Sequence, residues 1–179
     1  MDFEEKTLCK EYLYHGKVVT VRRDKAQLQD GQIVDREVVE HPGGVGIALK
    51  DEQDRFFLVT QWRYAQERAL LEFPAGKKEK GEDPLTTAKR EIIEETGYEG
   101  KNWVFLGEMV PTGAYDSEVI HMYYAEIGEY RGQHLDADEN LGLSRMTLDE
   151  LTEEIVRGNV PDGKTMAMTF LLKEYMKRK

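Results

Sequence analysis

The chain has 179 residues, of which 40% are hydrophobic, and a formal net charge of -10. This length predicts one main domain with enough apolar residues for a packed core. The negative charge argues against broad nucleic-acid binding, which needs a basic surface. It does not argue against a small anionic ligand, because metal ions and a few arginines can reverse the field in one cleft. No stretch of about eighteen apolar residues is present, so the sequence predicts no membrane helix.

The start of the chain is acidic and polar, and it lacks the basic and then apolar pattern of a secretory signal. The single cysteine, Cys9, cannot form an intramolecular disulfide, and no cysteine–histidine group has zinc-site spacing. A reducing cytoplasm is the simplest interpretation. No functional role is expected for the histidines, which are His15, His41, His121 and His134.

The first third of the chain has the pattern of β-strands. Residues 12–23 and 33–40 alternate in polarity and contain β-branched side chains, which predicts two strands. The pair Asp30-Gly31 between them is favoured in hairpin turns. Residues 41–44, His-Pro-Gly-Gly, then interrupt the pattern.

Further strands are predicted in the middle of the chain, at residues 45–49, 56–62, 103–109 and 119–127. The first two are separated by a polar turn. Mixed strands with scattered helices predict an α/β or α+β domain. Trp62, Tyr12 and Tyr14 could stack on a nucleobase, but an aromatic residue in a strand more often belongs to the core, so the stacking residue stays open.

Two helices are predicted near the C-terminus. One runs from about Leu148 to Arg157, after Thr147 as N-cap, and the other runs from about Gly163 to Lys177, after Asp162. A third helix is predicted earlier in the chain. Asp83-Pro84 is a favourable start for it and Gly97 a favourable end. Residues at three- and four-residue steps form its inward face, namely Leu85, Ala88 and Ile92.

This earlier helix carries three glutamates within five consecutive residues, Glu91, Glu94 and Glu95. Glu91 and Glu95 project from one face a turn apart, where like charges destabilise a helix by a few tenths of a kcal/mol. A bound hard cation such as Mg²⁺ would remove that repulsion. Arg90 is four residues before Glu94 and could also reach a glutamate in the preceding loop, and so hold the carboxylates in position. The alternative is an ordinary solvated face, which a glutamate pattern on its own would favour.

The whole segment resembles the Nudix box, G-x5-E-x7-R-E-U-x-E-E-x-G-U, where U is a bulky apolar residue. The matching positions are Gly76, Glu82, Arg90, Glu91, Ile92, Glu94, Glu95, Gly97 and Tyr98. Nudix proteins hydrolyse nucleoside diphosphates linked to another group, using Mg²⁺ or Mn²⁺. The resemblance implies an α/β/α sandwich with a mixed sheet, in which the box forms a loop, a helix and a second loop.

Over nearly its full length the chain also resembles the bacterial ADP-ribose pyrophosphatases of this family. The segments that carry this resemblance are Arg36–Gly43, Gln61–Tyr64, Glu72–Gly76 and Ala137–Asn140. The resemblance implies a homodimer in which a small N-terminal antiparallel sheet is exchanged between subunits. Residues 1–42 would form that sheet region, and residues 43–179 would form the Nudix domain. The chain departs from the subfamily at one place: the marker proline is expected about sixteen residues past the glycine that closes the box, near Gly113, and Pro111 lies a little earlier.

The resemblance implies a set of metal ligands. The backbone carbonyl of Ala75 joins Glu91 and Glu95 as the primary ligands, and Glu94 and Glu82 contribute through water or as supporting groups. Mg²⁺ is the expected ion, with Mn²⁺ as a substitute.

The remaining site residues are implied with defined roles. Glu139 is the expected general base, with Glu94 and Arg90 as supporting catalytic residues; the alternative for Glu139 is a loop glutamate that faces solvent. Arg36 and Arg63 suit a diphosphate, because a guanidinium makes two-pronged contacts with phosphate oxygens. Each could instead form a surface ion pair. Two further substrate contacts are Glu118 and Gly76, whose lack of a side chain lets a ligand approach the backbone.

The expected reaction is therefore Mg²⁺-dependent cleavage of ADP-ribose into AMP and ribose 5-phosphate. Two alternatives stay open. One is a pyrophosphatase that acts on another nucleotide sugar, and the other is a sensor that binds ADP-ribose without cleaving it. The second is less favoured, because such sensors usually lack some box carboxylates and this chain keeps all of them.

Overall fold

The computed structural model describes residues 3–135 and 140–178. It divides into two compact units. Unit 1 is Met1–Gly43 together with Val110–Val119, and unit 2 is Gly44–Met109 together with Ile120–Lys179. The domain limits predicted from the sequence, 1–42 and 43–179, stay a prediction.

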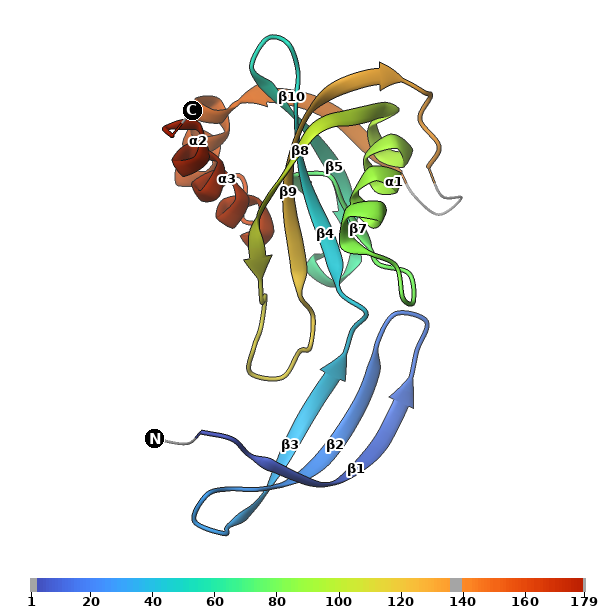
Figure 1. Cartoon of the computed structure of the whole chain (residues 1–179), viewed down its shortest axis with the longest axis vertical. Helices are drawn as coiled ribbons and strands as arrows, with labels where there is room; N and C mark the ends of the chain where they lie inside the picture. The colour runs from blue at the N-terminus through green and yellow to red at the C-terminus, as the bar shows by residue number, and fades with distance from the viewer. Residues whose placement is uncertain (1–2, 136–139, 179) are drawn as a thin grey trace. The chain divides into compact units, whose positions relative to one another are not determined.

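Unit 1 contains a three-stranded antiparallel sheet, in which β2 lies between β1 and β3 (Figure 1). Its strands are β1 (Lys6–His15), β2 (Thr20–Gln27) and β3 (Ile33–Glu40). The turn predicted at Asp30-Gly31 joins β2 to β3, and Gly31 adopts a φ of 87° that favours glycine. The hairpin predicted around residues 30–31 is confirmed.

The strand predicted over residues 12–23 is wrong, because it spans the turn between β1 and β2. The chain reverses at Gly16, whose N–H donates to the carbonyl of Val19 at 2.9 Å. The β-branched residues Val18 and Val19 follow that glycine, and they make the turn look like a continuous strand in the sequence.

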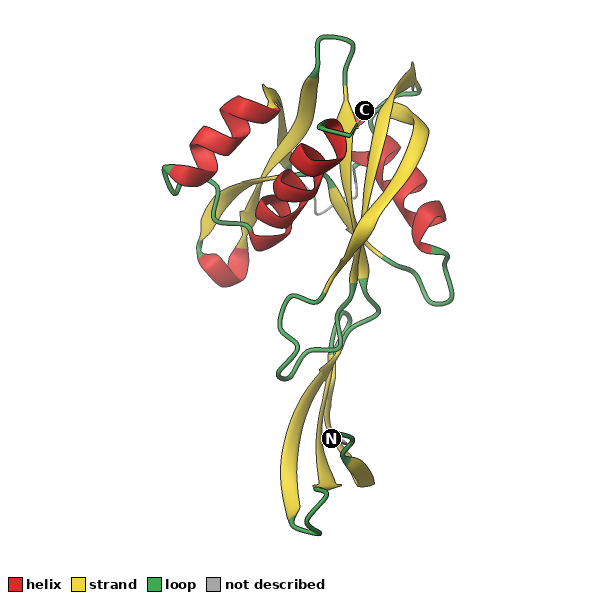
Figure 2. Cartoon of the chain, turned by 60° about the vertical axis from the view of Figure 1, so that its left-hand side comes forward, coloured by secondary structure: helices red, strands yellow, loops and turns green. Residues whose placement is uncertain are grey.

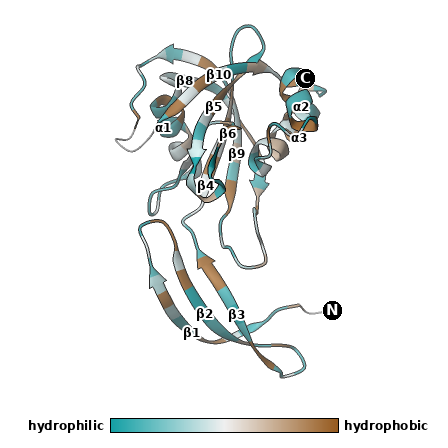
Figure 3. Cartoon of the chain, turned by 180° about the vertical axis from the view of Figure 1, so that it is seen from behind, coloured by the Kyte–Doolittle hydropathy of each residue, from teal (hydrophilic) through white to brown (hydrophobic). Residues whose placement is uncertain are grey.

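The small sheet exposes much of its apolar surface. Every residue of β1 is exposed, and Figure 3 shows hydrophobic stretches interspersed with hydrophilic ones along the three strands. From the sequence, a core position was the more frequent alternative to nucleobase stacking for Tyr12 and Tyr14. The two side chains are 48% and 58% exposed.

Unit 1 also includes the segment that contains Pro111. Two backbone hydrogen bonds tie this segment to β3: Val39 N–H donates to Tyr115 at 2.7 Å, and Ser117 N–H donates to Val39 at 3.0 Å. Residues 110–119 therefore pack with the N-terminal strands, although they follow the Nudix box in sequence.

Unit 2 is built on a seven-stranded mixed sheet with the central order β10-β5-β4-β9-β8. β4 and β9 are parallel, whereas the other pairs are antiparallel. β6 pairs with β5, and β7 pairs with β4. The strands are β4 (Gly44–Lys50), β5 (Arg55–Arg63), β6 (Arg68–Glu72), β7 (Ala75–Lys77), β8 (Tyr98–Met109), β9 (Ile120–Tyr130) and β10 (Leu141–Thr147).

The three predicted helices are confirmed, and so are their starts. They are α1 (Pro84–Thr96), α2 (Leu148–Val156) and α3 (Gly163–Met176). The side chains of Asp83, Thr147 and Asp162 each accept a backbone N–H from the first turn. Gly97 ends α1 in the left-handed region, with a φ of 78°.

Helices cover both faces of the sheet, with α1 on one side and α2 and α3 on the other (Figure 2). Successive side chains of β4 point to opposite faces of the sheet, as in any β-strand. Val45, Ile47 and Leu49 pack with α1, and Ala48 packs with the other helices. The α/β/α arrangement with a mixed sheet is therefore confirmed, and so is the inward face of α1.

Some strands differ from the sequence prediction. β8 starts at Tyr98, five residues before the predicted 103, because the glycine and charged residues at its start resemble a loop. Three short strands were not predicted: β6, β7 and β10. In residues 3–135 and 140–178, no helix has the length and apolar composition needed to cross a bilayer.

Candidate active site

The site is built where α1 lies against β7. The helix follows a polar loop, and Asp83 caps its first turn by accepting the N–H of Thr86 at 3.1 Å. A Cβ added at Gly76 in β7 would lie 1.8 Å from Cδ of Glu91. Any side chain at Gly76 would therefore displace the Glu91 carboxylate. The position of the first helical glutamate of the motif thus requires glycine at the first position of the motif.

Arg90 lies among three glutamates. Its Nε and Nη2 donate to Glu82 at 3.2 and 3.1 Å, which is a two-pronged contact. Its Nη1 donates at 2.8 Å both to Glu91 and to Glu94. The expectation that Arg90 could also reach a glutamate of the preceding loop agrees with these contacts.

These contacts shift the pKa values of Glu82 and Arg90. The hydrogen bond from Arg90 lowers the pKa of Glu82 to about 2. The pKa of Arg90 is raised, with the hydrogen bond to Glu82 as the largest cause. Burial opposes that rise, and the nearby Glu91 and Glu94 support it. At neutral pH Glu82 is therefore a charged carboxylate held by the guanidinium of Arg90.

Glu95 is 2% exposed and is hydrogen-bonded to the first residue of β7. Its Oε2 accepts the backbone N–H of Ala75 at 3.1 Å. In a β-strand, the N–H and C=O of one residue point to the same side. The carbonyl of Ala75 therefore also faces α1, on the side where Glu91 and Glu95 project.

The donor set fits a hard divalent cation. It consists of carboxylate oxygens and a backbone carbonyl, and four carboxylates outnumber the single guanidinium of Arg90. Within residues 3–135 and 140–178, no three Asp, Glu, His or Cys side chains already lie together as a metal-binding group. Arg90 instead contacts three of the carboxylates directly.

Comparison with protein families agrees with this geometry. Residues 40–167 match the NUDIX domain model, and residues 5–39 match the model of the nucleoside diphosphate sugar hydrolase N-terminal domain. The chain belongs to the Nudix family.

Individual relatives are similar over nearly the whole chain. A methanol dehydrogenase activator from Bacillus methanolicus is 39% identical, with 99% of this chain and 98% of the relative covered. An ADP-ribose pyrophosphatase from Bacillus subtilis is 36% identical, with 90% and 89% covered. A crystal structure of an ADP compounds hydrolase superposes with a TM-score of 0.86 at 20% identity, covering 99% of this chain and 97% of that one, which supports the fold.

Beside the Nudix box, Arg63 at the end of β5 makes an ion pair. Its Nε and Nη2 contact the two carboxylate oxygens of Glu72 at 2.7 and 2.6 Å. Glu72 is 1% exposed, and the pKa of Arg63 is raised chiefly by this hydrogen bond. The alternative for Arg63 in the sequence analysis was a surface ion pair. Arg63 does form an ion pair, but that pair is partly buried. The role of Arg63 in diphosphate binding stays a prediction.

Two other expected substrate contacts lie in unit 1. Arg36 in β3 forms a two-pronged ion pair with Glu5, at 2.9 and 2.7 Å. Glu118 lies 3.2 Å from Nδ1 of His41 and is also held through its backbone N–H, which donates to Asp116. Their substrate roles stay predictions.

Glu139, the expected general base, lies outside the described residues. The stretch before it contacts the end of α1 at two points. His134 N–H donates to the carbonyl of Glu94 at 3.0 Å, and the Gln133 side chain donates to the carbonyl of Glu95. The chain that leads toward Glu139 is thus attached to the helix of the Nudix box.

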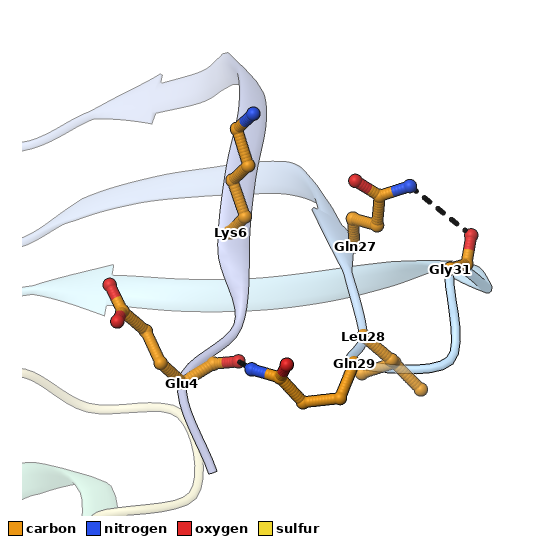
Figure 4. Close-up of a pocket in the computed structure, with 6 residues that line it drawn as sticks. All are labelled: Glu4, Lys6, Gln27, Leu28, Gln29 and Gly31. Atoms are coloured by element: carbon orange, nitrogen blue, oxygen red, sulfur yellow. Dashed lines mark hydrogen bonds between the residues drawn. The ribbon is translucent and has the colours of Figure 1, made fainter. Parts of the chain in front are cut away.

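Two surface features are formed by residues that do not belong to the Nudix box. Trp62 of β5, a candidate for stacking, is 61% exposed and so is not a core residue. A depression of about 600 Å³ in unit 1 contains none of the expected site residues (Figure 4). Its lining consists of Glu4, Lys6, Gln27, Leu28, Gln29 and Gly31.

Sequence reasoning gave no role to Lys164 and Thr165 at the start of α3, yet both hold the backbone of Phe73, two residues before Ala75. One signal was present in the sequence. Lysine in the first turn of a helix opposes the helix dipole, which favours acidic residues there. A lysine at that position therefore indicates a tertiary role.

Proposed function

We propose that this Nudix protein hydrolyses the diphosphate bond of ADP-ribose, releasing AMP and ribose 5-phosphate. The observation that carries the proposal is that Glu95 and Glu91 lie against Ala75 and Gly76, while Arg90 links Glu91 to the other two box carboxylates. The choice of substrate is supported by the 36% identity to a relative named ADP-ribose pyrophosphatase.

Mg²⁺ is the proposed cofactor, with Mn²⁺ as a substitute. The proposed ligands are the Ala75 carbonyl, Glu91 and Glu95, with Glu94 and Glu82 acting through water or as supporting groups. Their oxygen chemistry and negative charge support this assignment. When bound, the cation would neutralise phosphate charge and lower the pKa of a water molecule.

The chain's own groups orient and activate the reactants. Arg90 holds Glu82, Glu91 and Glu94 at fixed positions through four hydrogen bonds. Glu139 is the proposed general base, which takes a proton from the attacking water. The hydrogen bond from His134 to the carbonyl of Glu94 ties the stretch before Glu139 to α1, and this supports the proposal.

Arg36, Arg63 and Glu118 are the proposed substrate contacts, together with the backbone at Gly76. A guanidinium fork matches phosphate oxygens as well as it matches a carboxylate. Both arginines make two-pronged contacts with a carboxylate, Arg36 with Glu5 and Arg63 with Glu72, and this ability supports the proposed contact with a diphosphate.

The proposal includes a homodimer in the cytoplasm, with residues 1–42 as the region exchanged between subunits and Arg36 supplied by the partner. The exposed apolar side chains of β1 support a partner surface. The match of residues 5–39 to a separate N-terminal domain model supports the division of the chain.

Product analysis on a substrate panel tests the function. The panel contains ADP-ribose, other nucleotide sugars, dinucleotides and nucleoside triphosphates, each with Mg²⁺ or with EDTA. ADP-ribose should give the highest kcat/KM, and EDTA should abolish turnover. A clear preference for another nucleotide sugar would support that alternative instead. Mg²⁺-dependent binding without turnover would support the sensor alternative.

A second candidate is activation of a methanol dehydrogenase, which the 39% identity to a relative of that name favours. The experiment adds the purified chain to a methanol dehydrogenase and measures methanol oxidation. Acceleration by the wild type and not by Glu95→Gln would support a role that needs the Nudix box. Equal rates with and without the chain would remove this candidate.

A further inference from the structure

A buried ionic group lies at the start of α3. Lys164 is 6% exposed, and its Nζ donates to the carbonyl of Phe73 at 3.0 Å. The same Nζ lies 3.2 Å from Asp162 and 3.5 Å from Glu72. A buried ammonium needs such partners, because an unpaired buried charge is strongly destabilising. Burial raises the pKa of Asp162, but Lys164 and Thr165 outweigh burial and lower it, so Asp162 stays charged.

The neighbouring residue, Thr165, holds the other polar atom of the Phe73 backbone. Its Oγ1 accepts the N–H of Phe73 at 2.9 Å and donates to Asp162 at 2.6 Å. Thr165 is completely buried. Both polar backbone atoms of Phe73 are therefore bound by two consecutive side chains that lie about ninety residues later in the chain.

The residues after Phe73 lead directly to the proposed metal site. The carbonyl of Pro74 accepts the N–H of Ile47 at 2.8 Å, and the N–H of Ala75 donates to Glu95. Proline has a fixed φ, and the hydrogen bonds of the Pro74 carbonyl and the Ala75 N–H hold the peptide group that follows it, so rotation between Phe73 and Ala75 is restricted. The position of Phe73 therefore contributes to the direction in which the Ala75 carbonyl points.

The approach of α3 depends on a glycine in β4. A Cβ at Gly46 would lie 2.7 Å from Sδ of Met168 and 3.2 Å from Cδ of Lys164. Gly46 therefore allows α3 to lie directly on the strand, close enough for Lys164 and Thr165 to reach Phe73.

We propose that Lys164 and Thr165 are positioning residues for the metal site of this chain. They hold Phe73 so that the carbonyl of Ala75 and the carboxylate of Glu95 face the same ion. This inference rests on the proposed metal site, and it assigns part of that site's geometry to α3, which supplies no ligand itself.

The test compares two threonines of α3. Thr165→Val removes the hydroxyl that holds Phe73. Thr169→Val, the matched control one turn later, removes a buried hydroxyl that donates to the carbonyl of Thr165 at 2.8 Å. Thr165→Ser keeps the hydroxyl and serves as the conservative variant. Mn²⁺ binding to each protein without substrate is measured by electron paramagnetic resonance, and exchange of the Ala75 amide proton is measured by NMR.

Thr165→Val should weaken Mn²⁺ binding about tenfold, as loss of a group that orients a ligand does. It should also speed exchange of the Ala75 amide. The two variants Thr169→Val and Thr165→Ser should bind Mn²⁺ within about twofold of the wild type. If Thr165→Val does not fold, Thr165→Ala replaces it with the same expected result.

Equal Mn²⁺ binding by the variants at positions 165 and 169, with similar losses in Tm, would reduce Thr165 to a structural role and overturn the inference. The outcome is separate from that of the proposed reaction, because no substrate is present. A wild type that binds Mn²⁺ but leaves ADP-ribose intact would contradict the proposed function and leave the positioning role standing.

Discussion

Gly76→Ala is predicted to remove activity while leaving the fold intact. The new Cβ would lie 1.8 Å from Cδ and 2.2 Å from Oε1 of Glu91, whereas ordinary contact begins at 3.4 Å. The carboxylate must therefore move by about 1.6 Å, the difference between the two distances. Mg²⁺ requires its oxygen ligands at about 2.0–2.1 Å in a near-ideal arrangement. A displacement of this size should lower kcat/KM by roughly 100-fold or more.

Stability should change much less than activity. The clash involves Cγ, Cδ and Oε1 of Glu91, which belong to a flexible side chain that can rotate away. Alanine in a compatible backbone also restricts the unfolded chain, and that contributes about 0.4–1 kcal/mol in the opposite direction. The net effect on Tm should then stay within roughly 4 °C for a chain of this size.

The assay compares Gly76→Ala with the wild type and with Gly163→Ala, where an added Cβ meets no atom within 4 Å. Initial rates on ADP-ribose are measured over a range of Mg²⁺ concentrations, with Tm measured in parallel. The control should retain wild-type rates. A folded Gly76→Ala protein with a rate within threefold of the wild type would refute the role of Gly76 in making room for Glu91.

Four further changes give specific outcomes. Glu95→Gln should lower kcat by roughly 100-fold. Without metal, the Tm of this variant should equal that of the wild type or be slightly higher, because one like charge is removed at constant shape. Near-normal turnover would remove Glu95 from the metal site. Glu82 has a pKa of about 2, below its ordinary value of 4.5, so the stability it contributes is complete above pH 4.5 and lost as pH falls toward 2. The difference in urea-unfolding stability between wild type and Glu82→Gln should therefore be smaller at about pH 3.5 than at about pH 6, and a constant difference would contradict the assignment. Glu139→Gln should slow the chemical step without changing Mn²⁺ affinity. An unchanged rate would favour the alternative, in which Glu139 is a loop glutamate that faces solvent. Arg63→Lys should raise KM for ADP-ribose about tenfold by removing the fork; a lower Tm with an unchanged KM would restrict Arg63 to its ion pair with Glu72.

The parts of the fold that could be predicted from the sequence are those with local signals. The ends of α1 follow from Asp83 and Gly97, and the hairpin follows from Asp30-Gly31, because these residues act on their own neighbours. β4 and β5 are apolar runs and were also predicted. The turn at Gly16 and the three-residue strand β7 were missed, because each looks like a different structure in its local sequence.

The residues of the site also fall into those with a local signal in the sequence and those without one. The carboxylates of the Nudix box lie on one helix, so their spacing shows that they project together. The contacts of Lys164 and Thr165 with Phe73 join residues that are 91 and 92 positions apart. Asp162 looks like an ordinary N-cap in the sequence, which conceals its contacts with both of these side chains. Contacts of this kind follow from packing and have no local pattern.

Phosphorus NMR of ADP-ribose in the presence of the chain tests the central claim most directly. With Mg²⁺, the diphosphate signals should be replaced by two phosphomonoester signals of equal intensity, those of AMP and ribose 5-phosphate. With EDTA, or with Glu95→Gln, the diphosphate signals should persist over the same time. Persistence of the diphosphate with the folded wild type and Mg²⁺ would contradict the account.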